Sequence, residues 1–137
     1  MPKNGPIPLR LHAMIEPIIA LVFIVAPFVL DFDSSTARTL SIVIGVVILL
    51  VGMTTRWRLS LVKLVPLPMH FAGDVLIGVL SLAAPFLFGF SDETAALVFF
   101  LVMGAGELAA ALGTAWRPET DRADGRTRTA RSQPLSG

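Results

Sequence analysis

The chain has 137 residues, of which 54% are hydrophobic and 15% are charged, and its formal net charge is +1. An ordinary soluble domain is far less apolar than this. Cysteine is absent, which excludes disulfide frameworks, thiolate metal sites and thiol redox chemistry. The composition therefore predicts a membrane protein.

Four stretches are suited to be membrane spans, because a helix needs roughly 20 mostly apolar residues to cross a hydrocarbon core. We expect an all-α membrane protein of four transmembrane helices, surrounded by the lipid bilayer. In chain order the predicted spans are Leu11 to Leu30, Ala37 to Met53, Phe71 to Phe90 and Thr94 to Trp116.

The basic residues lie on one side of this predicted topology. Of the eleven Lys and Arg residues, ten fall in the N-terminus, in the connection between the second and third spans, or in the C-terminal tail. Only Arg38 lies in the other two connections, which instead hold Asp31, Asp33, Asp92 and Glu93. The positive-inside rule then places both termini and the middle connection in the cytoplasm.

A fixed offset relates the two halves of the chain. IPLRLHAMIE, which begins at Ile7, matches VPLPMHFAGD, which begins at Val65, an offset of 58 residues. Self-similarity of this kind marks a structural repeat. Each repeat holds two spans, so both insert the same way up and are related by a pseudo-two-fold axis along the membrane normal. The predicted parts are an N-terminal segment (1–10), repeat 1 (11–57), a cytoplasmic loop (58–68), repeat 2 (69–116) and a disordered cytoplasmic tail (117–137).

Each repeat carries a proline motif near the end of its first span. The motif is Ala26, Pro27 and Phe28 in repeat 1 and Ala84, Pro85 and Phe86 in repeat 2. In this motif the chain resembles the SPW repeat family of small bacterial membrane proteins, in which each repeat spans the membrane twice and carries Ser-Pro-Trp at this place. The resemblance covers about residues 7 to 116 and implies this fold and a bacterial plasma-membrane location, but no established activity.

The motif departs from the family pattern, since Ala replaces Ser and Phe replaces Trp in both copies. No role that needs the Ser hydroxyl or the indole N–H therefore carries over. A proline bends or ends a helix, and we expect Phe28 and Phe86 to pack into the space that the bend opens.

A small and polar stripe follows helical spacing along the first and third spans. Such stripes face the bundle interior and not the lipid. We expect Phe23 to fill the space left by Gly78 and Ser81, and Gly104 and Ala111 to give the fourth span a close-packing face. The stripes are His12, Glu16, Ala20, Phe23 and Pro27, and His70, Asp74, Gly78, Ser81 and Pro85.

Two His-carboxylate pairs are the best chemical candidates. His12 and Glu16 lie four residues apart, as do His70 and Asp74, which puts each pair within reach on one helix face. Glu107 in the fourth span is a third membrane carboxylate. Because ionisable groups in membrane helices face the interior, we expect all five to converge.

Three interpretations of this cluster stay open. The pairs can satisfy each other and fix the helix packing. The carboxylates can line a proton or cation path, which in so small a bundle would require a homo-oligomer. Lastly, His12 and His70 can be the axial ligands of a haem, supported by Glu16 and Asp74. We expect no other cofactor and no metal site.

The most direct interpretation is a structural or accessory module that packs as a homo-oligomer or with a larger membrane protein. The alternatives are an oligomeric proton or cation conductor and a bis-His haem protein. Since the chain holds no P-loop, dinucleotide fingerprint, HExxH or nucleophile elbow, we expect no catalytic residue and no enzymatic activity. Small residues suited to packing are Gly45, Gly52, Gly104, Gly106 and Gly113.

The ends of the second and fourth spans carry Trp57 and Trp116 beside Arg residues, as interfacial anchors do. Their offset of 59 predicts a one-residue shift between the repeats after Thr94. The tail beyond Trp116 is polar and mixes Arg with acids, so we expect it to be disordered and not to bind nucleic acid.

Overall fold

The computed structural model describes residues 1–117 and consists of four long helices. All four are long and apolar enough to cross a membrane, which confirms the predicted all-α membrane fold. The predicted tail lies outside the described residues from 118 onward. The helices are α1 (Leu9–Val29), α2 (Ser35–Thr54), α3 (Leu67–Leu87) and α4 (Thr94–Gly113). The predicted fourth span was therefore too long, because α4 ends three residues before Trp116.

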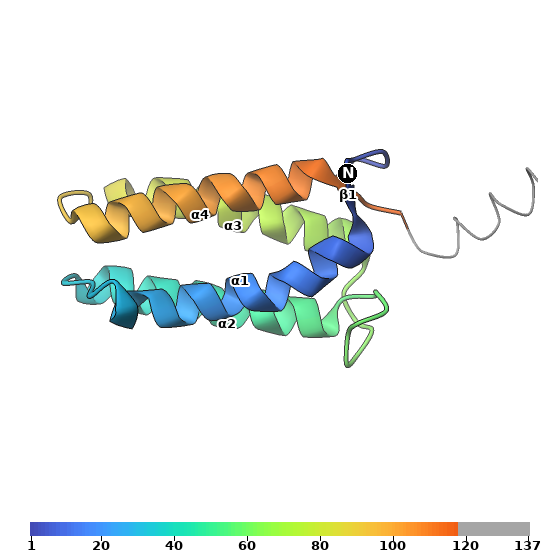
Figure 1. Ribbon diagram of the computed structural model, residues 1–137, viewed down its shortest axis with the longest axis horizontal. Coiled ribbons are helices and arrows are strands. Elements are labelled where there is room, and N and C mark those ends of the chain that lie inside the picture. Colours follow the sequence, from blue (N-terminus) through green and yellow to red (C-terminus); the bar gives the residue numbers. More distant parts are fainter. Residues whose placement is uncertain (118–137) are drawn as a thin grey trace, which may run out of the picture.

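The helices pack as two hairpins, α1 with α2 and α3 with α4, which lie side by side (Figure 1). One glycine in each hairpin lets the two helix backbones approach closely. A Cβ atom at Gly45 would stand 2.6 Å from the carbonyl oxygen of Ala20, and one at Gly104 would stand 2.8 Å from that of Gly78. Both contacts are backbone to backbone, so any side chain there would force the helices apart.

The proline motif forms the C-terminal turn of α1 and of α3. The carbonyl of Pro27 accepts a hydrogen bond from the amide of Phe32, and the carbonyl of Pro85 accepts one from Phe90. Between them, Asp31 (φ 52°) and Gly89 (φ 71°) take the same left-handed conformation, which commonly ends helices. Asp tolerates this conformation better than most residues, which explains why the two copies can differ there.

The residues after the two prolines do not pack as expected. Phe28 and Phe86 are each 63% exposed and point away from the bundle. The aromatic rings that fill the interior at this end belong instead to Phe32 and Phe90, which are 0% and 3% exposed. The expectation was wrong because the left-handed turn carries the chain back over the bundle and buries the later ring.

The two repeats are joined at the end where the N-terminus lies. β1 (Ile7–Pro8) pairs in parallel with β2 (Thr114–Ala115), and Thr55 forms an equivalent parallel bridge with Val65. In each case residues ahead of one repeat's first helix pair with residues after the other repeat's last helix. The bridges therefore join repeat 1 to repeat 2 twice, as a pseudo-two-fold arrangement requires.

The one-residue shift between the repeats lies earlier than predicted. α1 and α3 begin at Leu9 and Leu67, an offset of 58, whereas α2 and α4 begin at Ser35 and Thr94, an offset of 59. The extra residue is therefore in the connection before Thr94, not after it. A helix cannot absorb one residue without rotating its buried face, whereas a connection can.

The core between the hairpins uses complementary side chains in the two repeats. Phe23 in α1 corresponds to Ser81 in α3, and Ser41 in α2 corresponds to Phe100 in α4. All four are fully buried, and the rings of Phe23 and Phe100 pack edge to face with centroids 6.4 Å apart. Each hairpin thus holds one large and one small residue at this level.

Phe23 does not cover Gly78 as predicted. A Cβ atom at Gly78 would stand 2.7 Å from Cγ of Leu108 in α4, so the space above this glycine is used within its own hairpin. Phe23 instead packs on Phe99 and Phe100. The helical spacing correctly put Phe23 inside, but it carries no information on which neighbouring helix it meets.

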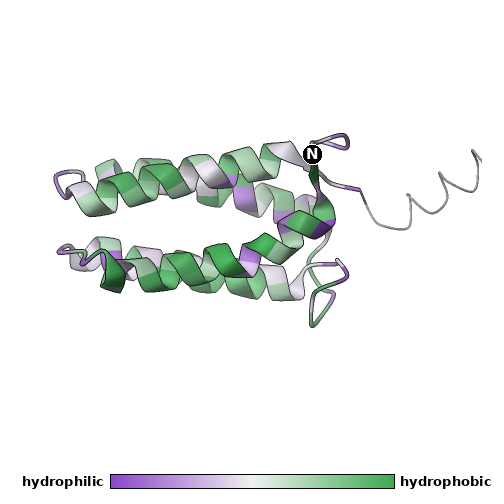
Figure 2. Cartoon of the chain, viewed as in Figure 1, coloured by the Kyte–Doolittle hydropathy of each residue, from purple (hydrophilic) through white to green (hydrophobic). Residues whose placement is uncertain are grey.

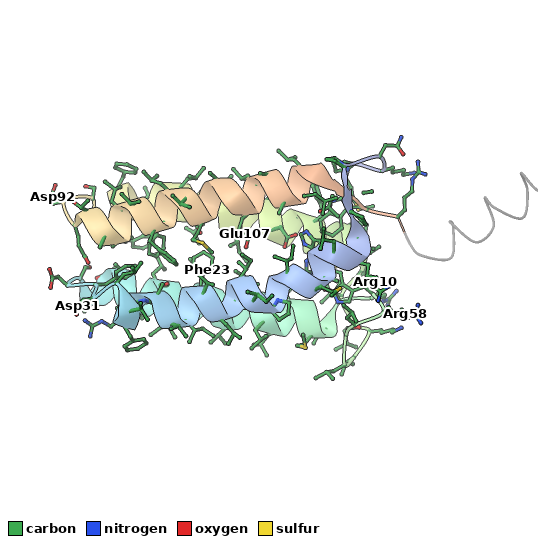
Figure 3. All side chains as sticks on the ribbon, in the orientation of Figure 1. Arg10, Phe23, Asp31, Arg58, Asp92 and Glu107 are labelled. Carbon is green, nitrogen blue, oxygen red and sulfur yellow. The ribbon has the colours of Figure 1, made fainter. Side chains whose placement is uncertain are left out.

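The surface is divided as a membrane protein requires. Apolar residues cover the length of the helices, and hydrophilic residues gather in the connections at both ends (Figure 2). Asp31 and Asp92 lie at one end of the bundle, and Arg10 and Arg58 lie at the other (Figure 3). A few hydrophilic positions remain within the helices, toward the basic end.

We predict that Phe100→Ala lowers the free energy of unfolding by about 3 to 5 kcal/mol, because it opens a cavity between the hairpins. Phe86→Ala removes the same side chain from the exposed surface and should change stability by less than about 0.5 kcal/mol. Unfolding by dodecyl sulfate in mixed micelles measures both. Equal losses in the two variants would contradict the packing described.

Candidate functional site

Four ionisable side chains meet inside the bundle near its basic end. His12 and Glu16 come from the first two turns of α1, and His70 and Asp74 come from the first two turns of α3. Their residues are at most 7% exposed, and His70 is fully buried. Pro17 stands inside α1, where its missing N–H and its ring bend a helix. Figure 1 shows the first turns of α1 inclined to the rest of it.

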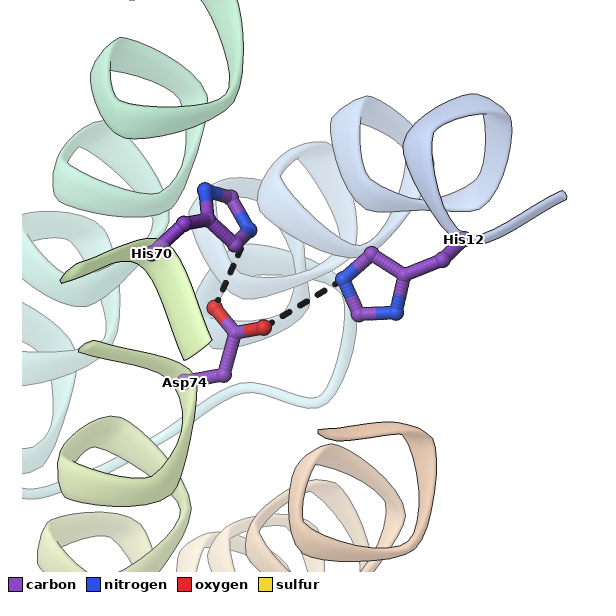
Figure 4. A group of neighbouring side chains, drawn as sticks. All are labelled: His12, His70 and Asp74. Carbon is purple, nitrogen blue, oxygen red and sulfur yellow. Dashed lines mark ion pairs between the residues drawn. The ribbon is translucent and has the colours of Figure 1, made fainter. Parts of the chain in front are cut away.

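The contacts in this cluster run mainly between the hairpins. Nε2 of His12 lies 3.3 Å from a carboxylate oxygen of Asp74, and Nε2 of His70 lies 3.2 Å from an oxygen of Glu16. Nε2 of His70 also lies 3.3 Å from the other oxygen of Asp74, which is the predicted contact within one helix. Asp74 therefore stands between both imidazoles (Figure 4). Among the described residues, His12 forms its ion pair with Asp74 and not with Glu16, because the bent start of α1 directs it across the interface.

Two threonines orient the imidazole rings. Oγ1 of Thr55 donates to the carbonyl of Val51 at 2.7 Å and lies 2.6 Å from Nδ1 of His70. A hydroxyl has one proton to donate. We assign this proton to the carbonyl, which makes Nδ1 of His70 the donor to the hydroxyl oxygen. Thr114 does the same for Nδ1 of His12, at 3.0 Å, while it donates to the carbonyl of Ala110.

This orientation determines what the other ring nitrogen can do. With a proton on Nδ1, Nε2 of a neutral imidazole presents a lone pair, and here it faces carboxylate oxygens that also carry lone pairs. Such contacts are attractive only when a proton or a cation lies at them. Two carboxylates and two neutral imidazoles carry two negative charges, so the buried cluster is neutral only with two positive charges added.

Trp57 and Trp116 enclose the histidines. They are 7% and 1% exposed, and their indole N–H groups donate to the carbonyls of Gly52 and Ala111. The ring of Trp57 lies with its centroid 4.4 Å from that of His70, and the ring of Trp116 lies 5.0 Å from that of His12. The expectation that these residues are interfacial anchors was wrong, because the chain turns inward after α2 and α4 to form the β-bridges.

The two carboxylates differ in length, and their surroundings differ to match. A Cβ atom at Gly52 would lie 3.1 Å from Cδ of Glu16, which is closer than side chains normally approach. At the equivalent place in repeat 2, Ala111 takes the position of Gly52 and the shorter Asp74 takes that of Glu16. The longer acid is therefore combined with the residue that lacks a Cβ atom.

Glu107 lies beside the cluster, not within it. A cavity of about 300 Å³ separates α1 from α4 and is lined by His12, Glu16 and Glu107 among apolar residues. Figure 3 shows Glu107 on the side of α4 that faces the other hairpin. The three ion pairs of the cluster, within the described part of the chain, do not include Glu107. The prediction that all five groups converge therefore holds for four of them, and Glu107 lies on the cavity beside them.

The remaining predicted packing residues all lie in the interior. Phe23, Ser81 and Ala111 are fully buried, as are Pro27 and Pro85 of the repeat motif. Ala26 and Ala84 are 8% and 0% exposed, and Gly78 and Gly104 are also buried, whereas Phe28 and Phe86 face outward. The hydroxyl oxygen of Ser81 is buried without a hydrogen-bond partner among the described residues.

Four residues of the site were not expected from the sequence. Thr55, Trp57, Thr114 and Trp116 hold and cover the two histidines. The signal that could have found them is the pattern Thr-x-Trp, which occurs at the end of each repeat with an offset of 59. The Trp residues alone, each beside an Arg, match the pattern of interfacial anchors.

We predict that Gly52→Ala destabilises the protein by about 1 kcal/mol, because the new methyl group displaces the carboxylate of Glu16. Adding Glu16→Asp should restore most of this loss, since the double variant reproduces the combination found in repeat 2. A double-mutant cycle of unfolding free energies measures the coupling. Gly106→Ala is the control, because a Cβ atom there meets nothing within 4 Å. Additive effects of the two substitutions would contradict the contact.

Comparison with known families identifies both hairpins together. The family model described as SPW repeat domain matches residues 10–114, which span all four helices except the first residue of α1. Comparisons with curated proteins and with solved structures found no match.

Proposed function

The chain belongs to the SPW repeat family, and we propose that it is a structural or accessory membrane module whose buried His-carboxylate cluster joins two hairpins. It is a small multi-pass membrane protein with four spans. In this proposal the chain acts by packing and has no enzymatic activity. In this proposal the cluster holds the two hairpins together. Two bound protons neutralise its two carboxylates and make the contacts between the Nε2 atoms and the carboxylate oxygens attractive.

The observation that carries this proposal is the division of the interior. The cluster lies near the basic end, and phenylalanine rings fill the space between it and the acidic end, where Phe23, Phe32, Phe90, Phe99 and Phe100 contact one another in series. A proton or ion moving along the bundle axis would have to pass these rings. The interior is thus better suited to holding helices together than to conduction through one chain.

The fastening has a clear physical basis. Apolar helices gain little by leaving lipid for one another, so packing and polar contacts decide their association. The hairpins meet through the Phe rings, the cluster and the two β-bridges. Removing one partner of a buried polar pair leaves the other uncompensated, so the cluster favours one arrangement of the hairpins over others.

One of the five glycines that we expected to serve helix packing remains open to a partner helix. Of the five glycines expected to serve packing, Gly45, Gly52, Gly104 and Gly113 are used inside the chain, against Ala20, Glu16, Gly78 and Ile7 respectively. A Cβ atom at Gly106 meets nothing within 4 Å. Of these five glycines, Gly106 is therefore the one on a helix face that is open to a second copy or a larger membrane protein.

A second candidate function is an oligomeric proton or cation conductor. It is favoured by the cavity between α1 and α4, where Glu107 faces His12 and Glu16. In this alternative the path would run along the flank of the chain, between subunits, and so avoid the Phe rings.

A flux measurement separates the two functions. We predict that the purified protein in liposomes carries no proton current under an imposed pH gradient, and that Asp74→Asn changes nothing in this assay. Dye-reported internal pH is the readout, and a protonophore added at the end is the positive control. Flux in the wild type that Asp74→Asn or Glu107→Gln abolishes, with folding intact, would establish conduction instead.

The proposed location is the bacterial plasma membrane, with both termini in the cytoplasm. The support is that Arg10 and Arg58 lie at one end of the bundle and Asp31 and Asp92 at the other.

Reporter fusions test this orientation. We predict that a fluorescent protein that matures only in the cytoplasm is bright when fused after Gly137 and dark when fused after Ser91. A periplasmic phosphatase should give the opposite pattern at the same two positions. The reverse result at both positions would overturn the orientation.

A further inference from the structure

We propose that the cluster of His12, His70, Asp74 and Glu16 is a binding site for a divalent transition metal of the zinc class. The sequence predicted no metal, because the donors come from two repeats and show no ligand spacing along the chain. The structure brings one ligand atom each of His12, His70 and Asp74 within 4.8 Å of one another. Glu16 adds a fourth donor, 3.2 Å from Nε2 of His70.

Three separations between the donor residues are close to those of a tetrahedral site. Atoms bound to zinc at about 2.0 to 2.1 Å stand about 3.3 to 3.4 Å apart at the corners of a tetrahedron. The same bonds in an octahedron, the geometry of magnesium, would bring them to about 2.9 Å. The three nitrogen–oxygen separations here are 3.2, 3.3 and 3.3 Å, and the two that involve Asp74 are to its two different oxygens. These separations are nearer to tetrahedral than to octahedral spacing, and binding would require Asp74 to turn one oxygen toward both imidazoles. Two imidazoles and two carboxylates are also donors that zinc accepts.

Three donor atoms of the cluster are buried without a hydrogen-bond partner among the described residues. Nε2 of His70 is buried and lies 3.2 and 3.3 Å from two carboxylate oxygens, yet it is aligned for a hydrogen bond to neither. Oδ2 of Asp74 is likewise buried without a partner among the described residues, and so is Oε2 of Glu16, which is not the oxygen that lies 3.2 Å from His70. Unpaired buried polar atoms of this kind are rare in proteins, and a cation bound by these side chains would supply the missing partner.

The charge of the site fits one divalent cation. Two carboxylates with two neutral imidazoles carry two negative charges, so an ion of charge +2 makes the site neutral. Neutrality matters here because the residues lie inside membrane-spanning helices, where a net charge is costly. One such ion takes the place of the two protons that the fastening otherwise needs.

The second layer of contacts is already that of a metal site. A metal-bound histidine donates its other ring N–H to a nearby acceptor, which fixes the tautomer. Here the hydroxyls of Thr55 and Thr114 accept from Nδ1 of His70 and His12 and leave both Nε2 atoms free to bind. The cavity between α1 and α4, lined by His12, Glu16 and Glu107, gives an ion access to the donors.

A small cation suits this arrangement better than the haem considered from the sequence. Both Nε2 atoms face the oxygens of one carboxylate, Asp74 (Figure 4). A haem iron would need them on opposite sides of a flat macrocycle. The side chain of Asp74 stands in the place that the macrocycle would take.

Metal content and the spectrum of bound cobalt test the site. The full chain is purified in detergent with a histidine-free tag, stripped with a chelator, and titrated with Co²⁺ and then Zn²⁺. We expect one equivalent of metal per chain, with the intense visible bands that tetrahedral Co²⁺ gives. Zn²⁺ should displace Co²⁺ and raise the melting temperature of the protein.

Variants locate the bound metal. His70→Gln and Asp74→Asn remove first donors and should weaken Co²⁺ binding at least 100-fold. Thr55→Val leaves every donor in place and should weaken it about 10- to 100-fold, by releasing the ring of His70. Ser81→Ala is the matched control, since it removes a buried hydroxyl from the same helix, outside the cluster, and should bind like the wild type.

Three results would overturn the metal site. They are a folded wild type that takes up no metal, a weak octahedral cobalt spectrum, and equal binding by wild type and His70→Gln. If His70→Gln fails to fold, the wild-type spectrum and Thr55→Val still decide the question. The metal titration and the flux assay can fail independently. A protein that neither conducts nor binds metal would keep the proposed packing function and lose the metal site, and a protein that conducts and binds metal would do the reverse.

Discussion

The contact on which the structure depends is the carboxylate of Asp74 between two imidazoles from different repeats. It lies where lipid offers the helices little reason to associate, and two of the three ion pairs of the cluster, His12 with Asp74 and His70 with Glu16, need both hairpins. The surrounding features serve this contact. Pro17 inclines the start of α1, the threonines fix the tautomers, and the tryptophans exclude water from the rings. Placing ionisable groups in a membrane is costly, and each of these features reduces the cost.

The two repeats share a backbone but divide volume differently. The pair Phe23 and Ser41 in one hairpin corresponds to Ser81 and Phe100 in the other. Likewise, the pair Glu16 and Gly52 corresponds to Asp74 and Ala111. In both sets a larger residue on one helix stands with a smaller one on its partner. Perfect two-fold symmetry would put two Phe rings or two longer acids against each other across the axis. The exchange keeps the interior filled without such collisions.

The sequence predicts the spans, the repeat and the polar stripes well, because hydropathy, offset and helical spacing are properties of the chain itself. His12, Glu16, His70 and Asp74 were found in this way. Spacing along one helix does not tell which side chain of a second helix will be met, so the pairing of His12 with Asp74 and the cover of Gly78 by Leu108 could not be predicted. Trp57 and Trp116 were misplaced for a related reason, since two short β-bridges that hydropathy does not reveal turn them inward.

The two sides of the cluster, one toward α2 and one toward α4, are not equivalent, so the bundle is asymmetric about its pseudo-two-fold axis. The residue of α2 that corresponds to Glu107 is Ile48, which is 3% exposed and belongs to the apolar core. On that flank an aliphatic side chain takes the place of the carboxylate. On the other side, between α1 and α4, Glu107 lines the same cavity as His12 and Glu16. The same α4 face presents the open position at Gly106. If the cluster binds a metal and the chain packs against a partner, as proposed, both would use this one face of the bundle, and a partner seated there would also close the site.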